Sequence, residues 1–215
     1  MCTTWEDVFS MAKDEIDYIH SRITHEDNIT PRLEDLYRAF SLTPLDKVRV
    51  ILLGQDPYPG RFGDLPKATG LSFSIRENDP IIPPSLRNIF KELKFEYPGI
   101  KLDHGCLESW AKQGVLCLNM SLSGDIYVRG KHIGLWNGFL HYVFKALGGK
   151  KVVWILLGRE ARNFIEKIGS NNSYITAGHP SSMNVRGGFL KSNIFKSVNE
   201  RLDSPINWEI VKSTS

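Results

Sequence analysis

Asp56, Asn119 and His179 each follow an apolar run with the length and composition expected of a buried strand. The three runs cover residues 48–53, 115–118 and 173–176. The carboxyl ends of parallel strands lie on one edge of a sheet, so side chains far apart in the sequence can converge there. A carboxylate, an amide and an imidazole therefore form the candidate site.

These three groups lack the nucleophile of a hydrolytic triad, because no G-x-S-x-G elbow occurs and no cysteine lies at a strand end. Neither G-x-x-x-x-G-K-S/T nor G-x-G-x-x-G is present, which argues against a phosphate-cradling loop. The set suits release of a planar leaving group. Asn119 can donate to a pyrimidine carbonyl and accept from the ring N–H, the pattern of uracil. Asp56 can orient water and stabilise a cationic sugar, His179 can hydrogen-bond a departing base anion, and Phe73 can stack on the base.

Purely structural roles compete with these functional ones. Asp56 can bond local amides in its Asp-Pro turn, and Asn119 can cap the turn after its strand. His179 can be a buried, satisfied histidine, and Phe73 can belong to the core. Tyr58 can simply cover its turn, and Ser85 can be a helix N-cap. The residue types alone leave both readings open.

The totals describe a globular protein with 41% apolar and 24% charged residues among 215. A formal charge of +3 is weak evidence for a polyanionic partner. The three cysteines have no metal-ligand spacing, so no metal site and a reducing compartment are expected. The first residues do not resemble a secretion signal, and the apolar runs are too short to cross a membrane. We expect an intracellular protein, cytoplasmic or nuclear depending on its source, with the host nucleus as the site for a viral protein.

Helical stripes alternate with the strands. Thr4 followed by Asp7 indicates a helix start, and Pro31 marks the first turn of a second helix whose stripe includes Leu33. Residues 59–70 are expected to form a polar loop, 71–75 a short strand or an extended segment, and 151–157 another buried strand. Further helices are predicted after residues 83–85, at 105–113, at 136–147, after 157 and at 190–202. This order predicts a single α/β domain over residues 1–215. Its centre is a four-stranded, mostly parallel, twisted sheet flanked by helices on both faces.

Five segments, in order, resemble the motifs of family 1 uracil-DNA glycosylases. They are Gly54-Gln55-Asp56-Pro57-Tyr58, Gly70-Leu71-Ser72-Phe73-Ser74, Pro83-Pro84-Ser85-Leu86, residues 110–119 (WAKQGVLCLN) and His179-Pro180-Ser181. The closing Pro205-Ile206-Asn207-Trp208 is similar to that family's Pro-Ile-Asp-Trp. The resemblance runs from about Trp5 to Val211. It implies the family's three-layer fold and hydrolysis of the bond between uracil and deoxyribose in single- or double-stranded DNA, leaving an abasic site for base excision repair.

The resemblance also implies a role for each matching residue. Asp56 would position water and stabilise the cationic sugar, and His179, in its neutral form, would stabilise the uracil anion. Asn119 would read the base edge, Phe73 would stack on it and Gln55 would bond it. No metal, cofactor or covalent intermediate is implied.

Tyr58 would exclude the methyl group of thymine. The nucleotide must flip out of a duplex, and Met183 stands where the family inserts a leucine into the vacated stack. The remaining DNA contacts would position the backbone without reading sequence. They are Pro83, Pro84, Ser85, Gly178, Ser181, Ser182 and Arg186.

The sequence departs from the family pattern at several places. Pro59 replaces a histidine, the loop to Gly70 is longer than usual, Ser182 replaces a proline, and residues 123–133 diverge. We expect none of these to touch the catalytic pair. Alternatives are a catalytically weak DNA-binding or replication-associated module on the same fold, and a sister glycosylase of broader specificity. Expected partners are uracil-containing DNA and a proteinaceous inhibitor or replication partner, with the chain acting as a monomer and without a membrane.

Overall fold

The computed structural model describes residues 2–162, 172–181 and 188–212. Its central sheet has four strands in the order β5-β2-β7-β8, and every neighbouring pair is parallel. The strands are β2 (Val50–Gly54), β5 (Val115–Asn119), β7 (Val153–Leu157) and β8 (Ser173–Ala177). The predicted sheet is confirmed, and its pairs are parallel throughout.

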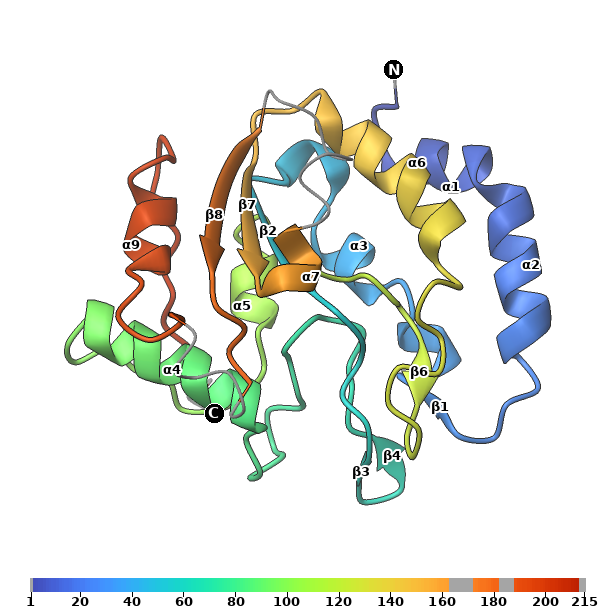
Figure 1. Cartoon of the computed structure of the whole chain (residues 1–215), viewed down its shortest axis with the longest axis horizontal. Coiled ribbons are helices and arrows are strands. Elements are labelled where there is room, and N and C mark those ends of the chain that lie inside the picture. Colours follow the sequence, from blue (N-terminus) through green and yellow to red (C-terminus); the bar gives the residue numbers. More distant parts are fainter. Residues whose placement is uncertain (1, 163–171, 182–187, 213–215) are drawn as a thin grey trace.

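The remaining elements surround this sheet (Figure 1). The helices are α1 (Trp5–Met11), α2 (Lys13–Ile23), α3 (Arg38–Leu42), α4 (Pro84–Glu96), α5 (Glu108–Ala111), α6 (Asn137–Gly148), α7 (Arg159–Arg162) and α9 (Ile194–Asn199), with 3₁₀ turns at Leu33–Asp35 and Leu45–Lys47. Two small antiparallel pairs join β1 (Ile29–Thr30) to β6 (Gly124–Asp125) and β3 (Arg61–Phe62) to β4 (Leu65–Pro66).

Strands β2, β5 and β7 are buried on both faces, so their side chains alternate between two cores, whereas the edge strand β8 is partly exposed. Ile51 and Leu53 of β2 face one core with the side chains of α1, α2, α3 and α6. Val50 and Leu52 face the other core with α4, α5 and α9. Figure 1 shows these two groups of helices on opposite sides of the sheet. The predicted three-layer arrangement is therefore present.

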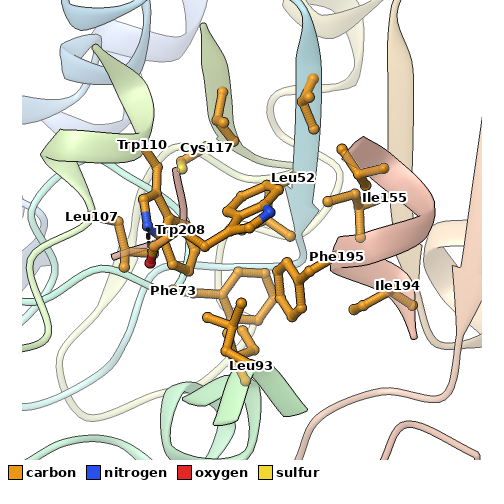
Figure 2. Close-up of a cluster of buried hydrophobic side chains, with 14 of the residues drawn as sticks. Leu52, Phe73, Leu93, Leu107, Trp110, Cys117, Ile155, Ile194, Phe195 and Trp208 are labelled. Carbon is orange, nitrogen blue, oxygen red and sulfur yellow. Dashed lines mark hydrogen bonds between the residues drawn. The ribbon is translucent and has the colours of Figure 1, made fainter. Parts of the chain in front are cut away.

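The second core is built around aromatic rings (Figure 2). The rings of Trp110 and Trp208 meet edge to face with centroids 5.2 Å apart, and Phe195 lies 5.0 Å from Trp208. The indole N–H of Trp110 donates to the carbonyl of Trp208 at 3.0 Å. The Pro-Ile-Asn-Trp segment thus contributes packing in this core.

Several local expectations are wrong. The chain after Pro31 forms a 3₁₀ turn and then α3, and Leu33 is 42% exposed instead of belonging to a buried stripe. Residues 71–75 form no strand, and Ser72 and Ser74 are as buried as their apolar neighbours. Their hydroxyls bond the Leu52 carbonyl and the Leu107 amide, which allows them to be buried. The polar loop at 59–70 contains the β3–β4 hairpin.

Candidate active site

The strands of the central sheet end level with one another. Gly54 of β2 pairs with Asn119 of β5, and Leu157 of β7 pairs with Ala177 of β8. Asp56 and His179 each follow two residues beyond these positions. The structure therefore brings the three predicted site residues to one edge of the sheet, which is where open α/β folds bind ligands.

Gly54 allows a close approach of Asn119 to the end of β2. A Cβ atom at Gly54 would lie 2.9 Å from Cβ of Ser72 and closer still to the side-chain oxygen of Asn119. Backbone amides of Met120 and Ser121 donate to the carbonyls of Gly54 and Gln55, at 2.9 and 3.0 Å. These backbone bonds close the turn, so the Asn119 amide is not needed as its cap. Asn119 is buried, with 7% of its surface exposed.

Asp56 is half-buried and surrounded by groups that favour its ionised form. Burial raises the pKa of its carboxyl group, and the charge of Arg129, the backbone amide of Gly130 and the charge of His179 oppose that rise. Arg129 and Gly130 belong to the divergent segment 123–133. The expectation that no departure touches the catalytic pair is therefore wrong.

The imidazole of His179 is held in one tautomer. The backbone N–H of Ser181 donates to its Nδ1 at 3.1 Å, which requires Nδ1 to be unprotonated and leaves Nε2 as the donor of the neutral ring. Burial lowers the pKa of His179, Asp56 acts in the opposite direction, and Arg129 lowers it further. Gly158, with φ of +88°, lets the ring pack closely, because a Cβ there would lie 2.9 Å from Cβ of His179.

A cavity of about 550 Å³ opens beside these residues. Its lining includes Gln55, Arg129, Gly178, His179 and Ser181, and the α7 residues Arg159 and Glu160 close its other side. Gln55 is exposed at the cavity wall. Asp56, Tyr58, Phe73 and Asn119 lie outside the lining of this cavity.

Phe73 is buried and Tyr58 is half-buried. Figure 2 shows Phe73 among the side chains of the second core, next to Phe195, and its φ is +61°. It is 9% exposed, so its stacking on a base stays a prediction. The Tyr58 hydroxyl is buried without a hydrogen bond of regular geometry to the described residues. Burial raises its pKa, and the nearby amide of Leu86 and the charge of Arg129 oppose that rise.

The predicted DNA-contacting residues lie around the first turn of α4 and after β8. Pro83 is the buried N-cap of α4, Pro84 is exposed and Ser85 half-buried, so Ser85 is not the N-cap. Gly178 is buried and donates its amide to Gly188 at 3.3 Å. Ser182, Met183 and Arg186 lie outside the described residues.

Helix α4 makes contacts that the sequence analysis missed. The Asn88 side chain donates to the carbonyl of Pro180 at 2.8 Å. Glu92 accepts hydrogen bonds from the amides of Lys191 and Asn193, at 2.5 and 2.8 Å. Glu96 likewise accepts from the amides of Phe195 and Lys196, in the first turn of α9. The signal in the sequence was the presence of two glutamates on the mostly apolar inner face of this helix.

The described residues contain neither a metal-ligand cluster nor a membrane-spanning helix. No three histidine, cysteine, aspartate or glutamate side chains in those ranges gather closely enough to bind a metal ion. No helix in the same part of the chain is both long and apolar enough to cross a membrane.

The model of the uracil DNA glycosylase superfamily matches residues 40–203, and the chain belongs to that superfamily. The uracil-DNA glycosylase of Aliivibrio salmonicida is 38% identical over 226 residues, which cover 98% of this chain and 99% of the relative. Uracil-DNA glycosylase 1 of Listeria innocua is 37% identical over 223 residues, with the same coverage. The resemblance seen in the motifs is confirmed.

Solved structures agree with this assignment. The crystal structure of mimivirus uracil-DNA glycosylase superposes with a TM-score of 0.88 at 26% identity, covering 96% of this chain and 86% of that one. A mimivirus UNG variant in complex with UGI also has a TM-score of 0.88, at 27% identity, covering 96% and 88%.

Proposed function

We propose that this protein is a uracil-DNA glycosylase of base excision repair, which hydrolyses the bond between uracil and deoxyribose in DNA. The observation that carries the proposal is the convergence of Asp56, Asn119 and His179 at the level ends of β2, β5 and β8. Membership of the superfamily and the names of its relatives support the same reaction.

His179 would act on the leaving group. With Nδ1 occupied by the Ser181 amide, Nε2–H is the donor available to O2 of uracil as the glycosidic bond breaks. The bonding electron pair leaves with the base, which departs as an anion stabilised by this hydrogen bond. A neutral donor suits the step, and the burial that lowers the pKa of His179 keeps it neutral.

Asp56 would act on the sugar. Its carboxylate stabilises the positive charge that develops at C1′ and orients the water that attacks this carbon. The water forms the new C1′–O bond and loses a proton, and the departed base ends as neutral uracil. The products are free uracil and an abasic site.

Asn119 and Tyr58 would set specificity. The Asn119 amide can donate to a uracil carbonyl and accept from its ring N–H, whereas cytosine presents the opposite pattern there. Tyr58, whose backbone carbonyl accepts a hydrogen bond from the Thr30 hydroxyl at 3.2 Å, would occupy the space of a thymine methyl group.

DNA and inhibitor proteins are the proposed partners. The contacts proposed for DNA are the first turn of α4 and the segment after β8, where amides and hydroxyls can bind phosphates. A proteinaceous inhibitor is supported by the complex of the mimivirus UNG variant with UGI. Action as a monomer inside the cell completes the proposal, and the three free cysteines fit a reducing compartment.

The test is release of uracil from a defined oligonucleotide, single- and double-stranded, followed by alkaline cleavage at abasic sites. Asp56→Asn and His179→Leu should each slow release by about 10² to 10⁴-fold while the thermal melt stays two-state. Asp203→Asn and His25→Leu change the same residue types at exposed positions and should leave the rate unchanged. Intact strands with both substrates would refute the proposal, and salt-sensitive binding without base release would then favour the DNA-binding module.

A further inference from the structure

Arg129 is a charged residue of the site that neither the motifs nor the superfamily assigns. It lies in the segment between β6 and α6 and lines the same cavity as Gln55 and His179. The next residue, Gly130, directs its backbone amide to the carboxylate of Asp56. The cation is therefore close enough to act on both groups of the proposed mechanism.

The loop that carries Arg129 is fixed at its base. Asp125 accepts hydrogen bonds from the amides of Tyr127 and Val128, at 2.8 and 3.0 Å, and pairs with Lys131 at 3.1 Å. Lys131 also pairs with Glu26, from the segment after α2, at 2.8 Å. Arg129 thus sits in a loop closed on itself by one carboxylate and tied to a second element.

The same loop is joined to the chain segment that carries Asp56. The amide of Gly60 donates to the carbonyl of Ile126 at 2.9 Å. On the far side of the loop, His132 is buried and bonded to Ser123 at 2.8 Å and to Glu26 at 3.2 Å. These contacts determine where the loop lies relative to Asp56, although the Arg129 side chain itself is exposed.

Asp56 and His179 share Arg129 as a charged neighbour, and each of the two also acts on the other. Among the described residues, the other charged side chains that line the cavity are Arg159 and Glu160 on α7, which lie beside each other at 3.6 Å and are both exposed. Their opposite charges largely cancel at a distance, whereas Arg129 acts on both members of the pair.

We propose that Arg129 is a positioning residue. Its permanent positive charge keeps Asp56 ionised and His179 neutral in the free enzyme, before DNA binds. This inference rests on the proposed function, and it concerns a residue that is not part of the family motifs. A cation at this place also favours the uracil anion as it forms beside His179.

The sign of the effect follows from the charges. Removing the cation raises the pKa of Asp56, and it also raises the pKa of His179, because a positive neighbour no longer opposes protonation. The active form needs both groups deprotonated, so the acid limb of the pH profile of kcat/KM must move to higher pH. Because Arg129 is exposed, we expect about 0.5 to 1 pH unit, shrinking as salt is added.

The experiment compares Arg129→Gln, Arg129→Lys and the double variant Arg159→Gln/Glu160→Gln with the parent protein. Arg129→Gln should shift the acid limb upward and Arg129→Lys should restore most of it. The double variant removes an opposite-charge pair from the same cavity and should leave the limb in place. An NMR titration of the His179 imidazole should show the same ordering. That second readout tests the inference without turnover, so it separates failure of the proposed function from failure of this proposal.

Two results would overturn the proposal. One is an Arg129→Gln protein that is slowed equally at every pH, with an unchanged titration of His179. The other is an equal shift in Arg159→Gln/Glu160→Gln, which would mean that the limb responds to any change of side chains at the cavity.

Discussion

Replacing Gly54 by alanine should damage recognition of the base while leaving the fold intact. The new methyl group would lie 2.9 Å from Cβ of Ser72 and closer to the side-chain oxygen of Asn119. Ordinary contacts between carbon atoms are about 3.5 to 4.0 Å, so the overlap is at least about 0.6 Å. Ser72 is fixed by its hydrogen bonds to the backbone of Leu52 and Cys117, which leaves Asn119 as the group that moves.

A displacement of about 1 Å at a positioned group can cost on the order of 100-fold in rate. We therefore expect Gly54→Ala to lower kcat/KM for uracil release about 100-fold. Gly149→Ala is the control, because a Cβ there meets no atom within 4 Å and its backbone is not left-handed. Steady-state kinetics and a thermal melt of both variants measure the two effects separately.

A double-mutant cycle gives the sharper test. In an Asn119→Ala background the methyl group has no amide to displace, so Gly54→Ala should add little further loss. Wild-type kcat/KM in Gly54→Ala, or full additivity in the cycle, would refute the argument that Gly54 acts through Asn119.

Two further predictions concern stability. Burial raises the pKa of Glu96 to about 7, so its contribution to stability is present below its unfolded pKa and is lost as pH rises through about 7. Urea unfolding at about pH 5 and about pH 8 should show a pH-dependent loss that Glu96→Gln reduces by up to about 3 kcal/mol; equal pH dependence in both proteins would contradict this. Lys67 pairs with the buried Asp79 at 2.7 Å, so Lys67→Met should destabilise the protein by about 3 to 5 kcal/mol. Adding Asp79→Asn should recover part of that loss, and a Lys67→Met protein as stable as its parent would exclude a role for the pair.

The strands and the convergence of the site could be predicted because both follow from local patterns. Apolar runs of strand length fixed β2, β5 and β7, and the parallel order then required Asp56 and Asn119 to share an edge. The prediction of a strand at residues 71–75 was wrong for a physical reason. Its alternation is that of a strand, but the hydroxyls of Ser72 and Ser74 find partners in distant backbone, and no local pattern contains those partners.

Arg129 could not be predicted for a similar reason. Its place near Asp56 depends on contacts of its own segment, between Asp125 and Lys131, with Glu26 about 100 residues earlier in the chain. The divergence of this segment from the family pattern suggested that it was peripheral. Sequence similarity locates a site through its motifs, whereas electrostatic neighbours need only the right position in space.

The contacts of helix α4 also bear on how this protein can change. Asn88 holds Pro180 and Glu92 holds Lys191, four residues apart on one helix, a rise of about 6 Å. The chain between Pro180 and Lys191 is therefore bonded to α4 at both of its ends, whatever its length. Lengthening the chain between Ser181 and Lys191 need not disturb the sheet, because loop closure becomes only slightly harder as a loop lengthens. Ser181 itself must keep its place, because its amide donates to His179. The segment that we propose to contact DNA can therefore vary in length while both of its ends stay in place on α4.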